Sequence, residues 1–144
     1  MRKFIIFTDG GSKGNPGPAA IGVVICNEKG KIWKKYSHFL GKDRTNNEAE
    51  YEAVIFALSK LKQLLGKKLS EKTEVEIRTD SELLFNQIYG KYKILGEKIQ
   101  KFFLEVWNLK LDFKSVNFKL IKREQNKEAD KLVKEELKLS TNNT

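Results

Sequence analysis

Four acidic residues in the sequence stand where elements of secondary structure are expected to start or stop. Asp9 and Asp80 each follow a short apolar run, while Glu50 and Asp130 each lie about one turn ahead of an apolar helical stripe. No cluster of Cys or His accompanies them, so they form an all-oxygen set, which suits Mg²⁺ or Mn²⁺ better than zinc. In a basic protein, such a set indicates phosphodiester hydrolysis, in which two metal ions activate a water and stabilise the leaving oxygen.

The acids also have ordinary structural interpretations. Asp9 precedes Gly10, and Asp before Gly is common in turns that hold no metal. Glu48, close to Glu50, has the spacing of a helix capping box with Thr45. Because acids at the ends of elements are common, the metal interpretation depends on whether the fold brings the four together.

The strands expected around these acids have the pattern of a mixed sheet. Residues 4–7 and 20–26 are apolar runs too short for helices, and the chain returns through residues 32–40, which predicts a three-stranded antiparallel meander. Residues 75–80 and 116–120 predict two further strands. Because a helix separates strands that follow one another here, parallel pairing through right-handed crossovers is expected, and this places the carboxyl ends of the strands at one edge of the sheet.

Apolar residues at helical spacing predict the helices that connect these strands. In the first helix the stripe of Val54, Leu58 and Leu61 reaches back to Glu50. Residues 41–44 and the Lys-rich stretch after Gly66 are expected to be loops. The sequence therefore predicts an α/β fold with a five-stranded mixed sheet, three antiparallel strands followed by two parallel ones, and helices on both faces. The predicted helices cover residues 45–66, 81–89, 95–111 and 126–139.

The length and charge of the chain favour one domain that binds a polyanion. With 144 residues the chain has the size of about one domain, and we expect residues 1–139 to form it and residues 140–144 to be a polar flexible tail. There are 28 Lys and Arg against 19 Asp and Glu, which gives a net charge of +9. Nucleic acid is the first candidate partner for such a protein.

The sequence shows no sign of export or of a membrane anchor. The apolar run that begins at Phe4 is too short for a signal peptide, and no 18-residue apolar stretch follows. The single Cys26 cannot form an internal disulfide and suits a reducing compartment. We therefore expect a cytoplasmic protein that acts as a monomer and has no membrane partner.

Short motifs along the chain closely resemble those of type 1 ribonuclease H, in the order of that family. The resemblance covers nearly the whole chain and is greatest to the compact subgroup without a basic helical protrusion, because Gly90 to Lys93 lead directly into the next helix. It implies a ribonuclease H-like fold in which the four acids hold two Mg²⁺ ions, for which Mn²⁺ can substitute. The motifs are Thr8-Asp9-Gly10-Gly11-Ser12 with Gly14-Asn15-Pro16-Gly17-Pro18, Thr45-Asn46-Asn47-Glu48-Ala49-Glu50, Thr79-Asp80-Ser81 and Asn126-Lys127-Glu128-Ala129-Asp130.

The resemblance also implies the substrate and the reaction. The substrate would be an RNA/DNA hybrid whose RNA strand is cut endonucleolytically to leave a 5′-phosphate and a 3′-hydroxyl. Recognition would use the minor groove, where the 2′-hydroxyl distinguishes RNA from DNA. Thr45 has capping as an equally good role. The substrate-binding residues that the resemblance implies, with Arg123 added from the loop before the last helix, are Gly10, Gly11, Asn15, Thr45, Asn46, Asn47, Ser81 and Arg123.

The chain departs from the family in the loop before the last helix. Many members have a histidine there, whereas this loop is Lys122-Arg123-Glu124-Gln125. Arg123 either holds the scissile phosphate or is a surface charge. Without the protrusion, affinity for the hybrid would come from the lysines between Lys91 and Lys101, and it would depend steeply on salt.

Two other functions stay open at this level. One is a broader endoribonuclease that also cuts double-stranded RNA, because a groove that reads shape admits both duplexes. The other is a module that binds hybrids without cutting them, which would not need all four acids.

Overall fold

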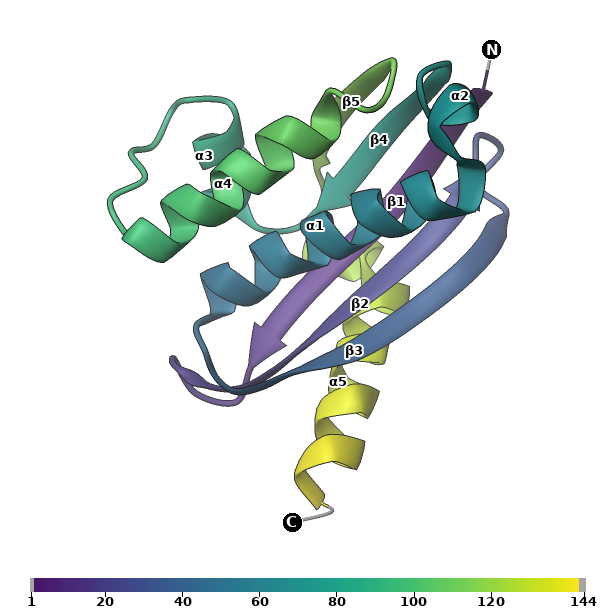
Figure 1. Cartoon of the computed structure of the whole chain (residues 1–144). Coiled ribbons are helices and arrows are strands. Elements are labelled where there is room, and N and C mark those ends of the chain that lie inside the picture. Colours follow the sequence, from purple (N-terminus) through teal and green to yellow (C-terminus); the bar gives the residue numbers. More distant parts are fainter. Residues whose placement is uncertain (1, 143–144) are drawn as a thin grey trace.

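The computed structural model describes residues 2–142 and contains a five-stranded sheet with the strand order β3-β2-β1-β4-β5 (Figure 1). Strands β1, β2 and β3 pair antiparallel, β4 pairs parallel with β1, and β5 pairs parallel with β4. This confirms the predicted mixed sheet. The strands are β1 (Arg2–Ser12), β2 (Gly17–Asn27), β3 (Ile32–Arg44), β4 (Thr73–Thr79) and β5 (Ser115–Leu120).

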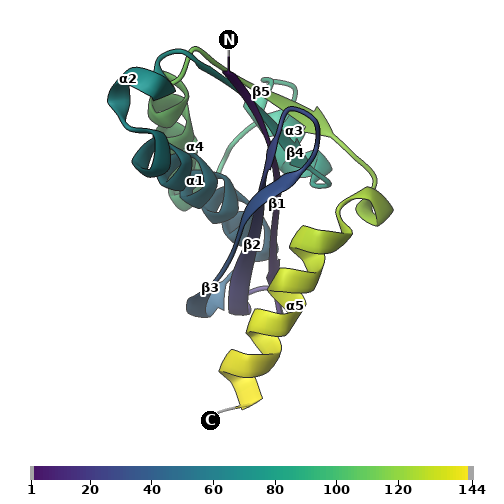
Figure 2. The same ribbon diagram turned by 90° about the vertical axis from the view of Figure 1, so that its right-hand side faces the viewer.

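Helices cover both faces of the sheet, as predicted. Helices α1 and α4 lie side by side on one face, and α5 lies on the opposite face (Figure 2). Short helical segments fill the connections before β4, after β4 and after β5. The helices are α1 (Asn46–Leu65), α2 (Lys67–Ser70), α3 (Glu82–Ile88), α4 (Glu97–Lys110) and α5 (Lys127–Asn142), with a 3₁₀ turn η1 (Arg123–Gln125).

Helix α1 forms where the capping box predicted it. The Thr45 hydroxyl accepts a hydrogen bond from the Glu48 amide at 3.1 Å, and the Thr45 amide donates to the Glu48 carboxylate at 2.7 Å. These bonds satisfy amides that a helix start leaves free. The stripe of Val54, Leu58 and Leu61 is completely buried against the sheet.

The core has a large layer and a smaller one. The larger layer lies between the sheet and the helices α1 and α4, and it includes Ile6, Ile25 and Ile77. The smaller layer, under α5, includes Ile5 and Val24. Because neighbouring residues of β1 point to opposite faces, the continuous apolar run that begins this strand is explained by burial on both sides.

The structure corrects several element boundaries. Strand β1 does not end at Asp9 but continues to Ser12, because β2 pairs with its last residues. Residues 41–44 belong to β3 and pair with β2 across a bulge, so strand pairing overrides their loop-like composition. The Lys-rich stretch after Gly66 contains α2.

The end of the chain also differs from the expectation. Helix α5 continues to Asn142, where the Ser140 hydroxyl donates to Glu136 at 2.8 Å, so residues 140–142 are helical and not a flexible tail. Residues 143–144 of the expected tail lie outside the described residues. The extent of the domain, residues 1–139, stays a prediction.

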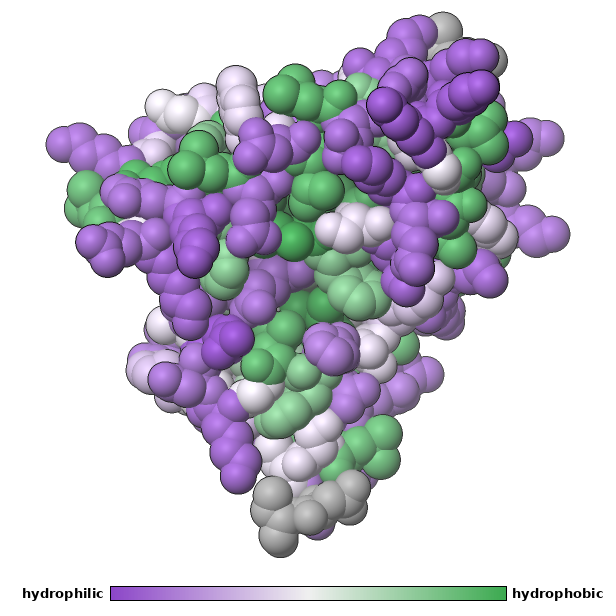
Figure 3. All heavy atoms as spheres, in the orientation of Figure 1, coloured by the Kyte–Doolittle hydropathy of each residue, from purple (hydrophilic) through white to green (hydrophobic). Residues whose placement is uncertain are grey.

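The surface is mostly hydrophilic. Figure 3 shows hydrophilic side chains over much of the face that α1 and α4 form, with smaller hydrophobic patches between them. Within residues 2–142, no helix combines the length and the apolar character that crossing a membrane requires.

Helix α5 is held very close to the sheet at Gly22 of β2. A Cβ atom at this position would lie 2.3 Å from the Ala129 carbonyl oxygen in the first turns of α5. Since real Cβ atoms do not approach backbone so closely, the position of α5 depends on a glycine here.

We predict that Gly22→Ala lowers the free energy of unfolding by about 1–3 kcal/mol, because α5 must move away from β2 to admit the methyl group. Urea denaturation measures this change. Gly96→Ala is the control, since no atom lies within 4 Å of its Cβ position, and it should cost less than about 1 kcal/mol. Equal losses in the two variants would contradict the close packing.

Candidate metal centre

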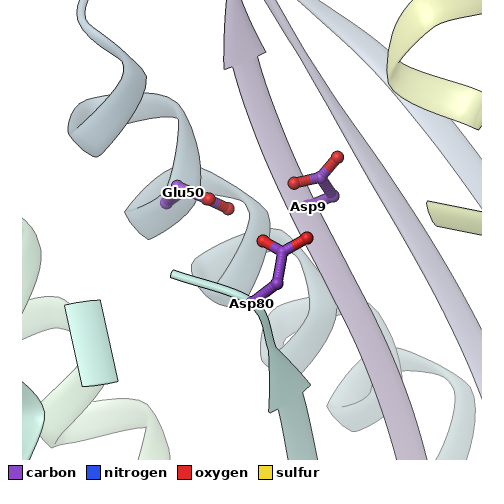
Figure 4. A group of neighbouring side chains, drawn as sticks. All are labelled: Asp9, Glu50 and Asp80. Carbon is purple, nitrogen blue, oxygen red and sulfur yellow. The ribbon is translucent and has the colours of Figure 1, made fainter. Parts of the chain in front are cut away.

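Parallel pairing of β1 and β4 brings Asp9 and Asp80 together. The paired register ends at Phe7 and Arg78, so Asp9 and Asp80 both lie two residues further on at the same edge of the sheet. Asp9 is still inside β1, whereas Asp80 follows the last residue of β4. Their carboxylates face each other, and that of Glu50 points toward them from α1 (Figure 4).

Glu50 is fixed against β1 by a backbone hydrogen bond. The Gly10 amide donates to Glu50 Oε1 at 2.9 Å. A Cβ atom on Gly10 would lie 2.3 Å from the carbonyl carbon and oxygen of Ala49, so any side chain here would push α1 away. Gly10 therefore sets the distance between the helix that carries Glu50 and the strand that carries Asp9.

The structure brings all four predicted acids to one cavity of about 400 Å³. Asp9, Glu50 and Asp80 form its close group, in which one carboxylate oxygen from each residue lies within 4.8 Å of the others. Asp130, in the first turn of α5, lines the same cavity and is hydrogen-bonded to Asp9. Carboxylates this close together can hold a metal ion.

The acids repel one another in a largely desolvated place. Burial, with the charges of Asp80 and Asp130, raises the pKa of Asp9 to about 8. Burial, followed by the charges of Asp9 and Asp80, raises the pKa of Glu50 well above its ordinary value. Burial also raises the pKa of Asp80, although a hydrogen bond to Asn126 opposes the rise. A bound cation would relieve this repulsion.

Asn126 is a residue of the site that the sequence reasoning did not single out. It is 1% exposed, and its Nδ2 donates to the Thr8 carbonyl at 2.9 Å, across 118 positions of the chain. It is also hydrogen-bonded to Asp80, and its own carbonyl accepts from the Asp130 amide at 3.1 Å. It thus joins β1, the end of β4 and α5. Its place one helical turn before Asp130 was the available signal.

Four of the predicted substrate-binding residues line the acidic cavity. They are Gly10, Gly11, Asn46 and Arg123. Asn46 is held by two hydrogen bonds: its Oδ1 accepts from the Ser12 amide at 2.9 Å, and its own amide donates to another side chain. Arg123 extends from η1, and its charge lowers the pKa of the carboxylates nearby, so it is part of the cavity wall.

The other four predicted residues lie outside the walls of that cavity and make contacts within the protein. Asn15 Oδ1 accepts from the Asn46 amide at 2.8 Å. Thr45 caps α1, and Ser81 caps α3 by accepting from the Leu84 amide at 3.1 Å. Asn47 donates to Gln87 of α3 at 3.4 Å.

Comparisons with known proteins agree with this architecture. A family model described as "Reverse transcriptase-like" matches residues 7–136. The chain is 45% identical to LC11-RNase H1, isolated from compost by a metagenomic approach and solved in complex with an RNA/DNA hybrid; the match covers 92% of this chain and 94% of that one, with a TM-score of 0.85.

Curated relatives are more distant in sequence. The chain is 31% identical over 131 residues to Ribonuclease HI of Halobacterium salinarum, with 91% of this chain and 62% of the relative covered. It is equally similar to the bifunctional protein Rv2228c of Mycobacterium tuberculosis, with 90% of this chain covered. The chain spans about a third of the length of the mycobacterial relatives that it matches.

The strand order, the helices on both faces and the acids at one sheet edge together define a ribonuclease H-like fold with a carboxylate centre. The chain belongs to the type 1 ribonuclease H family. This confirms the resemblance in its motifs.

We predict that Asp9→Asn stabilises the metal-free protein, and more so at pH 8 than at pH 5. The Asp9 carboxyl has a pKa of 3.8 in the ordinary case and about 8 in the fold. The folded state therefore holds this proton more tightly, and it loses stability as the pH rises between these values. Asn removes that loss, so we expect a gain of roughly 1–3 kcal/mol at pH 8.

Denaturation by urea in EDTA at the two pH values measures the gain. Asp43→Asn, which changes an exposed carboxylate of β3, is the control and should be nearly neutral at both. A destabilised Asp9→Asn variant at pH 8 would show that the carboxylates do not repel one another as described.

We predict that Asn126→Ala lowers the free energy of unfolding by about 1–3 kcal/mol, because the buried Thr8 carbonyl loses its donor. Asn126→Asp should cost at least as much at pH 8, since it adds a carboxylate to the acidic group. Asn117→Ala, at an exposed position of β5, is the control for the same assay. Equal stability of Asn126→Ala and Asn117→Ala would exclude the joining role of Asn126.

Proposed function

We propose that this protein is a metal-dependent endoribonuclease that hydrolyses the RNA strand of RNA/DNA hybrids and leaves 5′-phosphate and 3′-hydroxyl ends. The close group of Asp9, Glu50 and Asp80, with Asp130 in the same cavity, carries the proposal. A module that only bound nucleic acid would gain nothing from these charges, because they repel phosphates. Membership of the ribonuclease H family and the hybrid complex of LC11-RNase H1 support the choice of substrate.

The donor set fits magnesium. All four candidate ligands are carboxylates, which Mg²⁺ prefers, and their crowding in a buried place calls for positive charge. We assign two Mg²⁺ ions to Asp9, Glu50, Asp80 and Asp130, with Mn²⁺ able to substitute. When bound, such ions supply an activated water and neutralise the charge that develops on the leaving oxygen.

The protein's own groups keep the carboxylates in place. The Gly10 amide holds one oxygen of Glu50, and Asn126 holds Asp80. Such fixed geometry favours catalysis, because the ligands do not have to rearrange during the reaction. Arg123 is the cation of η1 that faces the cavity, and we assign it the scissile phosphate of the RNA.

The residues around the cavity are suited to reading a minor groove. Asn46 Oδ1 is engaged by the Ser12 amide, which leaves the Nδ2 group to donate to acceptors on base edges. Gly10 and Gly11 let backbone approach the RNA. We assign Asn47 and Ser81 to the same strand.

A separate pair of residues is assigned to the DNA strand. Asn15 and Thr45 lie next to the start of α1 and are bonded to its first turn. Amides at the start of a helix attract anions, so a DNA phosphate is the ligand that we assign to this place.

The connection between α3 and α4 supports the assignment to the compact subgroup, because only residues 89–96 separate these helices. The exposed Lys91, Lys93 and Lys101 are candidates for backbone contacts in place of a protrusion. Lys98 is a weaker candidate, since its ammonium lies 3.4 Å from the Glu48 carboxylate. We further propose that the protein acts as a monomer in the cytoplasm.

We predict that the protein cuts an end-labelled RNA strand in a hybrid duplex with Mg²⁺ and not with EDTA. Asp9→Asn should lower the rate by at least about 100-fold, because it removes a shared ligand of the metal centre. Asp43→Asn is the matched control and should cut at the rate of the unchanged protein. A gel electrophoresis time course gives the rates.

The same assay separates the alternative functions. Lanes with the RNA paired to RNA test for cleavage of double-stranded RNA, and lanes with single-stranded RNA test for an unspecific nuclease. Binding of the hybrid in a gel shift without cleavage under Mg²⁺ or Mn²⁺ would identify a non-catalytic module and would refute the proposal.

A further inference from the structure

The acidic cavity contains a lysine that is already paired with one of its carboxylates. Lys134 Nζ lies 2.8 Å from Asp130 Oδ2, one turn further along α5. Both residues line the cavity with the close group of three acids. The side chain of Lys134 is 75% exposed and that of Asp130 is 30% exposed, so the ammonium approaches the cavity from the solvent side.

Asp130 differs from the other acids in its place. It is not a member of the close group of Asp9, Glu50 and Asp80, and it contacts that group through Asp9. Its other contact is the ammonium of Lys134. Asp130 therefore lies between the three clustered acids and a positive charge that the protein itself supplies.

We infer that Lys134 competes with the metal ion for Asp130 and thereby sets the metal concentration that this protein requires. The inference rests on the proposed function, because it assumes that a divalent cation binds at these acids. A cation that used Asp130 would have to displace the ammonium or bind beside it, and like charges a few ångströms apart repel each other. The lysine thus raises the metal requirement.

The competition should be reversible and moderate in size. An exposed pair four residues apart on a helix is weak, so a divalent ion can displace the ammonium. The repulsion between a unit charge and a divalent ion at the mouth of a solvated cavity corresponds to a change in affinity of about 3- to 10-fold.

The same helix provides a matched control. Lys131 pairs with Glu135, also four residues apart, at 3.9 Å, and its side chain is 70% exposed. Unlike Lys134, it is not among the residues that line the acidic cavity. Changing either lysine to Gln removes one positive charge and one pair of the same kind, so the two variants differ in the contact with Asp130.

The test is calorimetric titration of Mn²⁺ into the full chain without nucleic acid, at constant pH and salt. We expect Lys134→Gln to lower the Mn²⁺ concentration that half-fills the sites by about 3- to 10-fold, and Lys131→Gln to change it by less than about 2-fold. In the Asp130→Asn background, Lys134→Gln should give no such gain, because the shared carboxylate is gone.

Hybrid cleavage by the unchanged protein, measured with the same samples, separates the two proposals. If it cleaves with Mn²⁺ while Lys134→Gln binds the ion no more tightly, or while both Gln variants bind it equally more tightly, the competition is refuted and the proposed function stands. If the unchanged protein neither binds Mn²⁺ nor cleaves, both are refuted.

Discussion

At one edge of the sheet, Asp9, Glu50 and Asp80 hold carboxylate oxygens within 4.8 Å of one another while burial raises the pKa of all three residues. Negative charges in such a place repel, so the surrounding structure has to hold them there. The parallel pairing of β1 and β4 fixes two of them, and a backbone amide fixes the third. The stability of the metal-free fold is lowered by the same arrangement that makes the site ready for cations.

Close approach without side chains is the means by which the helices reach this edge. Gly10 lets α1 come near enough to place Glu50, and Gly22 does the same for α5 on the opposite face. Asn126 then joins the start of α5 to β1 and to Asp80. The two faces of the sheet thus use the same physical device, and the acids from both faces meet beyond the end of β4.

Much of this could be predicted from patterns that act locally. The capping box at Thr45 and the apolar stripe behind Glu50 gave the start and the buried face of α1 correctly, because both depend on residues a few positions apart. The end of β1 was wrong, since pairing with β2 extends it past the glycines. Asn126 was not singled out because its partner, Thr8, is 118 positions away and only the fold shows the contact. The roles of the individual site residues stay predictions.

The contact between Asn126 and Thr8 has a consequence for the order of events after synthesis. It joins the beginning of the described chain to its last helix, so the four acids meet only after α5 has docked on the sheet. A nascent chain that has not yet released this helix from the ribosome lacks Asp130 and the brace on Asp80. On the function proposed here, the protein would stay harmless to the RNA around it until its own translation is nearly finished.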